Sequence, residues 1–148
     1  MRYFVIEMIN IFRILSIVLF LFPVFTVAQY KTTPKDNHRE IFTAVESGID
    51  DGIVEKFSVY FGKQVYVSIT SGENGYYSTN QAYYILKNFM NARKPLGFTF
   101  TTYGLTDKIP FATGRAAFRY KGNREYIQVY VSLCQVENNW VIDKINFY

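Results

Sequence analysis

Two consecutive segments in the second half of the chain, 111–121 and 125–136, alternate apolar and polar side chains. A period of two places each set on its own face of a β-strand. Gly122 and Asn123 separate the segments and are typical turn residues, which predicts an antiparallel hairpin. The sequence therefore predicts a sheet with one apolar face, which needs a covering layer, and one face of Tyr, Thr, Ser, Gln and Arg.

Three more strands are expected around this hairpin, over Val65–Thr70, Phe98–Thr106 and Trp140–Tyr148. In the last of them the apolar positions change phase between Ile142 and Ile145. An extra residue at Asp143 and Lys144 would restore both isoleucines to one face. We therefore expect a bulge there, which bends the sheet.

Helical spacing of apolar residues predicts three helices. They are expected from His38 to Gly48, from a cap at Asp50 or Asp51 to Gly62, and from Ser78 or Thr79 to Pro95. The second helix would carry Phe57 and Phe61 on one face. The order of elements predicts an α+β fold in which three helices pack on the apolar face of a strongly curved antiparallel sheet, a half-closed cone.

This order and the ending Trp140, Ile142, Ile145 and Phe147 resemble the nuclear transport factor 2-like superfamily, an α+β fold of cystatin-like type. Within it, Glu40–Tyr148 resembles the domain-of-unknown-function 4783 family of small exported bacterial proteins. The other residues that carry the resemblance are Ile41, Phe42, Val45, Gly52, Phe57, Val65, Val67, Gln81 and Phe89. These are core residues, so the resemblance implies a fold and no activity, because this fold hosts enzymes, binding modules and dimerisation domains alike.

The first 28 residues have the pattern of an export signal. Arg13 precedes an uncharged apolar run over Ile14–Phe25, and Thr26 to Ala28 supply the small residues of a cleavage site. Cleavage after Ala28 predicts an exported, periplasmic chain that begins at Gln29. Residues 29–37 are then a polar tether, and residues 38–148 form one domain.

The alternative is a retained membrane anchor. A span of about 20 residues would have to include Glu7, Asn10 and Arg13, and a charge at mid-helix is costly. Twelve residues over Ile14–Phe25 suit a signal peptide better than a span. Met8 is an alternative start to Met1, since it leaves a more compact segment before Arg13.

Chemistry-bearing residues are sparse. His38 is the only histidine and Cys134 the only cysteine, so neither an internal disulfide nor a zinc site of the usual ligands is expected. We expect Cys134 to be a packing residue and no cofactor to be bound. Asp143, aimed by the bulge, and Tyr103, near the mouth of the cone, are the candidate catalytic residues if the cone holds a small apolar substrate.

The polar sheet face is the more function-like surface, because Tyr and Arg are enriched where proteins make contacts. Its candidate binding residues are Tyr66, Tyr103, Arg115, Arg119, Tyr126, Gln128 and Tyr130. The same residues also suit a solvated strand face, since Tyr and Thr are good strand formers. If this face makes the contacts, we expect a homodimer.

The leading interpretation is an exported, non-enzymatic binding or interaction module. Its partner would be a protein, a glycan or a small apolar ligand. We expect no nucleic acid partner because of export, and membrane contact only through an uncleaved leader. The alternatives are an enzyme acting on a small apolar substrate in the cone and a membrane-tethered accessory protein. The chain has 16 basic and 12 acidic side chains, a net charge of +4, which favours anionic partners only weakly.

Overall fold

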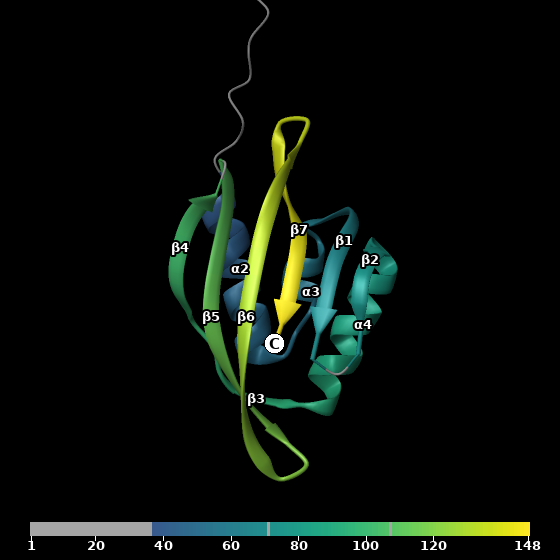
Figure 1. The fold of residues 1–148 in the computed structure, drawn as a ribbon, viewed down its shortest axis with the longest axis vertical. Helices are drawn as coiled ribbons and strands as arrows, with labels where there is room; N and C mark the ends of the chain where they lie inside the picture. Colours follow the sequence, from purple (N-terminus) through teal and green to yellow (C-terminus); the bar gives the residue numbers. More distant parts are fainter. Residues whose placement is uncertain (1–36, 71, 107) are drawn as a thin grey trace, which may run out of the picture. The chain divides into compact units, whose positions relative to one another are not determined.

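The computed structural model describes residues 37–70, 72–106 and 108–148. The expected signal and nearly all of the expected tether lie outside these residues. The elements follow in the order α2 (His38–Asp51), α3 (Glu55–Ser58), β1 (Phe61–Ile69), β2 (Asn74–Ser78), α4 (Thr79–Ala92), β3 (Lys94–Gly97), β4 (Phe100–Thr106), β5 (Ile109–Tyr120), β6 (Asn123–Val136) and β7 (Asn139–Phe147) (Figure 1).

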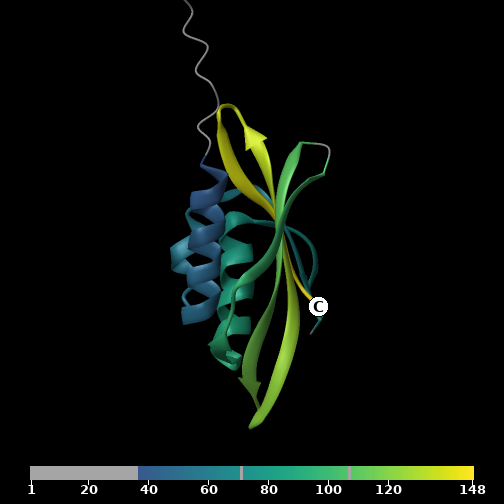
Figure 2. The same cartoon turned by 90° about the vertical axis from the view of Figure 1, so that its left-hand side faces the viewer.

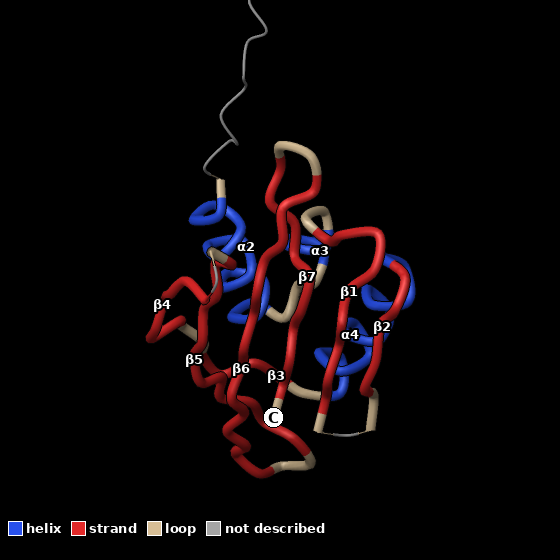
Figure 3. The backbone as a smooth tube through the Cα atoms, turned by 45° about the horizontal axis from the view of Figure 1, so that its top comes forward, coloured by secondary structure: helices blue, strands red, loops and turns tan. Residues whose placement is uncertain are grey.

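The strands form one seven-stranded sheet in the order β2-β1-β7-β6-β5-β3, and β4 also pairs with β5. All pairs are antiparallel except β1 with β7. The three helices lie on one side of the sheet (Figures 2 and 3). We call that side the inner face and the opposite side the outer face. The predicted fold class, three helices on a curved α+β sheet, is confirmed.

The predicted hairpin is confirmed as β5 and β6, whose pairing runs from Phe111 opposite Ser132 to Tyr120 opposite Asn123. Lys121 and Gly122 form its turn with φ angles of 49° and 85°. Positive φ at both central turn residues matches the right-handed twist of the flanking strands. The turn end of the hairpin projects past the helices in both views (Figures 1 and 2).

The predicted bulge in β7 is also confirmed. Ser132 pairs with Lys144 and Leu133 pairs with Ile142, which leaves Asp143 as the extra residue. Ile142 and Ile145 are both 0% exposed, so the bulge returns them to the inner face. This is the packing reason for the phase change in the sequence.

The expected end of the first helix at Gly48 is wrong. Helix α2 continues to Asp51 and ends at Gly52, whose φ of 74° is the left-handed conformation that favours glycine. Gly48 serves packing instead, since a Cβ there would lie 2.4 Å from the ring of Phe57. A close helix approach, rather than a helix end, requires this glycine.

The expected second helix is mostly wrong. Only Glu55–Ser58 is helical, and Phe61 and Gly62 belong to β1. Phe61 still packs on Phe57, with ring centroids 5.9 Å apart, so the two share an apolar cluster across a helix and a strand. The helical spacing of these two residues was therefore coincidental.

Two short strands have no counterpart in the prediction. Strand β2 lies between the expected strand over Val65–Thr70 and the expected helix from Ser78 or Thr79. Strand β3 follows α4 directly and contains Pro95, which was expected only to end the helix. Both lie at sheet edges, where pairing with a longer neighbour compensates for weak alternation. The start of α4 agrees with expectation, because Ser78 and Gln81 form a capping box.

Apolar side chains fill the space between the inner face and the helices. Phe118 and Phe147 are 0% exposed, and the ring of Phe89 from α4 lies 5.7 Å and 4.8 Å from theirs. Val129, Val131 and Leu133 of β6 are also fully buried. The predicted apolar face is thus the floor of the core.

Candidate functional site

The outer face carries most of the predicted binding residues. Arg115 pairs with Gln128, and the next outward pair joins Ala117 to Tyr126. Tyr66 reaches the same face from β1, opposite Lys144. No helix of the described residues covers this face (Figure 2). Six of the seven predicted residues therefore share one uncovered surface, namely Tyr66, Arg115, Arg119, Tyr126, Gln128 and Tyr130.

Cations lie against tyrosine rings across this surface. The guanidinium of Arg115 lies 4.7 Å from the ring centre of Tyr126, and that of Arg124 lies 5.7 Å from the same ring. The ammonium of Lys144 lies 5.2 Å from the ring of Tyr66. Tyr126 remains 52% exposed, so its ring is both flanked by cations and accessible. Such groups present large contact area with polar tips.

The sequence did not single out Phe111, Arg124 or Lys144, which belong to the same surface. The ring of Phe111 stacks on Tyr130 with an interplanar angle of 19°. Phe111 and Arg115 are four residues apart in β5, so the alternation of the strand places them on the same face. This spacing could have identified Phe111 from the sequence. The sequence does not assign Lys144 to a face, because the exact position of the bulge decides on which side of the sheet this residue lies.

Tyr103 lies on the opposite face from the other predicted residues. Its ring packs edge-on against Phe42 of α2 and Phe100, each at 5.8 Å. Partial burial and the nearby carboxylate of Glu46 raise the pKa of the Tyr103 hydroxyl. A bulge between Phe100 and Thr102 shifts the register of β4 and reverses the faces that later residues take.

Asp143 does not reach the inner face. It lies beside Cys134, and both burial and this carboxylate raise the pKa of the thiol. A raised pKa keeps the thiol protonated, which is the opposite of what a nucleophile requires. Cys134 alternates with the buried Leu133, so the pair belongs to the outer face.

A cleft of about 660 Å³ opens between the start of α2 and the β4–β5 hairpin. Its walls are mainly apolar, with Phe42, Tyr103 and Leu105 among them. Arg39 also lines the cleft, close enough to Tyr103 to oppose the rise in the pKa of the tyrosine hydroxyl. Tyr103 and Leu105 are 58% and 71% exposed, so this is an open mouth rather than an enclosed pocket.

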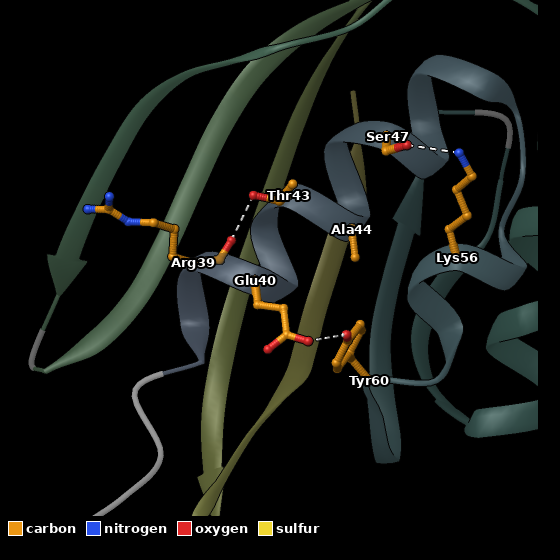
Figure 4. Close-up of a pocket in the computed structure, with 7 residues that line it drawn as sticks. All are labelled: Arg39, Glu40, Thr43, Ala44, Ser47, Lys56 and Tyr60. Atoms are coloured by element: carbon orange, nitrogen blue, oxygen red, sulfur yellow. Dashed lines mark hydrogen bonds between the residues drawn. The ribbon is translucent and has the colours of Figure 1, made fainter.

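A second, shallow groove lies between α2 and α3 (Figure 4). Its polar groups satisfy one another. Tyr60 donates a 3.1 Å hydrogen bond to Glu40, and Lys56 donates to Ser47 and also pairs with Asp51. Figure 4 shows Tyr60 facing Glu40 and Lys56 facing Ser47, which leaves few groups directed at a ligand.

Among the described residues, no group of three or more His, Cys, Asp or Glu side chains converges on a point that could hold a metal ion. None of the helices described is long and apolar enough to cross a membrane.

The architecture is that of the nuclear transport factor 2-like proteins. It is similar to such a protein of unknown function from Shewanella oneidensis, with 14% identity, a TM-score of 0.52, and coverage of 78% of this chain and 98% of that one. It is also similar to an uncharacterised cystatin-fold protein from Novosphingobium aromaticivorans, with 10% identity, a TM-score of 0.55, and coverage of 74% and 95%. These likenesses show the fold alone.

Within this class the chain belongs to the family described as Domain of unknown function (DUF4783), whose model matches residues 42–148. The predicted family is thereby confirmed. A DUF4783 protein from Bacteroides ovatus has 22% identity and a TM-score of 0.61, over 70% of this chain and 90% of that one. No curated protein matches the chain.

Proposed function

We propose that this chain is an exported, non-enzymatic interaction module that makes its contacts through the outer face of its sheet. The observation that carries the proposal is the contrast between the two faces of β6. Val129 and Val131 are 0% exposed under the helices, whereas Tyr126 on the other face is 52% exposed and flanked by two arginines. A surface of exposed Tyr and Arg on a rigid sheet suits protein contact.

The packing of the inner face favours this proposal over an enzyme in the cone. A catalytic pocket needs convergent polar groups shielded from water. Between the sheet and the helices lie the rings of Phe89, Phe118 and Phe147 instead. Of the two candidate catalytic residues, Asp143 lies on the outer face and Tyr103 lies in an open mouth.

The partner that we propose for the outer face is a second copy of this chain. A two-fold contact repeats the same patch on both sides, so the patch must complement itself. The outer face offers both the cation and the aromatic ring of a cation–π pair. Within one copy Arg115 faces Tyr126 and Lys144 faces Tyr66, and the same cations can face tyrosines of the second copy.

Sedimentation equilibrium tests self-association. We expect the wild type to have twice the mass of one chain, and Gln128→Lys to shift the protein toward monomer, because the added charge joins Arg115 in the middle of the patch. Gln135→Lys is the matched control on the same strand, exposed and away from the patch. A monomeric wild type would contradict the proposal, as would equal effects of the two substitutions.

Export is proposed from the pattern of the first 28 residues. Expression of the full chain in a Gram-negative host, followed by cell fractionation and intact mass measurement, tests it. We expect a periplasmic species that begins at Gln29. A full-length species in the membrane fraction would support the tethered alternative, and a full-length species in the cytoplasm would overturn export.

A further inference from the structure

Basic side chains gather at the projecting end of the β5–β6 hairpin. The segment 118–125 around the turn contains Arg119, Lys121 and Arg124 and a single carboxylate, that of Glu125. The hairpin end therefore carries a strong positive charge on a chain whose net charge is only +4.

Two of these cations, Arg119 and Arg124, stand side by side with Lys94 of the neighbouring strand. Lys94 of β3 pairs with Arg119 of β5, and Arg119 pairs with Arg124 of β6. Directly paired residues project from the same face of a sheet. All three are exposed. We call Lys94, Arg119 and Arg124 the basic row.

The only carboxylate of the hairpin does not neutralise this row. Glu125 accepts a 3.0 Å hydrogen bond from Nε of Arg93 on the inner side. The Arg93 guanidinium is held there between the rings of Phe89 and Tyr120, each 4.3 Å away. Among the described residues, no ion pair involves a member of the basic row.

Folding alone does not favour such a row. Like charges at directly opposed strand positions destabilise a sheet. Among the described residues, Arg124 contacts the Tyr126 ring, but no carboxylate pairs with any member of the row. A feature that works against local stability points to a functional role. An anionic surface would supply the compensation.

We propose that the end of the β5–β6 hairpin docks on an anionic lipid surface through the basic row. The hairpin extends past the helices, so its end reaches a flat surface without obstruction (Figures 1 and 2). Clusters of Lys and Arg bind anionic lipids in this way.

The docking does not depend on self-association. Each cation near an anionic membrane strengthens binding about fivefold. Replacing Lys94, Arg119 and Arg124 by Gln should therefore weaken binding to vesicles of 30% phosphatidylglycerol in phosphatidylcholine by roughly a hundredfold. Vesicles of phosphatidylcholine alone should not bind the wild type.

The control variant changes the net charge equally. It replaces Arg39, Lys63 and Lys108, which are exposed and lie away from the hairpin end, by Gln. We expect it to keep most of the wild-type binding. The basic-row variant should melt at the same temperature as the wild type or higher, because like charges are removed, so lost binding cannot be ascribed to unfolding.

Three outcomes would overturn the proposal. The first is failure of the wild type to bind anionic vesicles at low salt, and the second is equal weakening of binding by the control variant. The third is tighter binding to a soluble sulfated polysaccharide than to the vesicles, which would assign the row to an acidic polymer. Sedimentation without lipid reports on self-association separately, so failure of either proposal is distinguishable from failure of the other.

Discussion

The two faces of the β5–β6 hairpin are built from the same strands and have opposite chemistry. On the inner face, Ala116 and Phe118 are 0% exposed, and the Phe118 ring packs against Phe89 of the helix layer. On the outer face, the flanking positions hold Arg115, Ala117 and Arg119, with no covering helix in the described part of the chain. The period of two thus separates a surface that stabilises the fold from one that is free to make contacts.

This difference implies that the two faces respond differently to substitution. Burial and close packing dominate the free energy of unfolding on the inner face. On the outer face the interactions are exposed cation–π contacts, which contribute less to stability. Outer-face variants should therefore alter association while the fold persists.

The largest effect is expected for Phe118→Ala. The ring is 0% exposed and meets Phe89, so its removal leaves a cavity and should lower the free energy of unfolding by about 3–5 kcal/mol. Tyr126→Ala, on the neighbouring strand but on the outer face, should cost less than about 1 kcal/mol. Urea denaturation measures both, and equal losses would remove the distinction between the faces.

A smaller effect is expected for Gly114→Ala. A Cβ there would lie 2.3 Å from the carbonyl oxygen of Thr99, which belongs to the backbone and cannot rotate away. We expect a loss of about 1–3 kcal/mol from overpacking.

Gly104→Ala is the comparison on the outer face. Its Cβ would meet the far end of the Phe111 ring at 2.5 Å, and that half-exposed ring can turn. Thermal melting of the two variants should show the smaller loss at Gly104. A larger loss at Gly104 would mean that the stacked Phe111 and Tyr130 rings are as rigid as the core.

The smallest effect concerns the exposed edge of the helix layer. Glu55 accepts hydrogen bonds from Lys87 at 2.7 Å and Tyr83 at 2.5 Å, which lowers the pKa of its carboxyl from 4.5 to about 2. A depressed folded-state pKa stabilises the protein above the ordinary pKa, and this contribution is lost as pH falls from about 4.5 to about 2.

The melting temperature of the Glu55→Gln variant should therefore depend less on pH over this range than that of the wild type. Melting curves at intervals between pH 6 and pH 2 measure the difference. If the two proteins lose stability in parallel, the exposed cluster makes no net contribution, as is common for surface ion pairs.

Much of the fold follows from local pattern. The alternation over 111–136 predicts β5 and β6, and the phase change between Ile142 and Ile145 predicts the bulge at Asp143. Both predictions hold because one face of a sheet must be buried, so the register is fixed by the apolar set. The shared face of Arg115, Tyr126 and Gln128 follows for the same reason.

Other features depend on contacts that no local pattern records. Gly48 is typical of a helix end, yet it lies inside α2. The ring of Phe57 occupies the space that a side chain at this position would take. Tyr103 is a candidate from the sequence both for the polar sheet face and for the mouth of the cone, and a bulge after Phe100 turns it toward α2 and away from the outer face. The edge strands β2 and β3 exist because longer neighbours pair with them.

Residue periodicity is enough to predict the α+β class and the division of the sheet into an apolar and a polar face, and the family follows from the resemblance of particular residues, such as Trp140 and Phe147. The tertiary structure alone decided that Lys94, Arg119 and Arg124 form a row. Lys94 lies 25 positions before Arg119 in the chain, and only strand register places them side by side. Register is a property of pairing between distant segments, so the basic row appears only in the folded sheet.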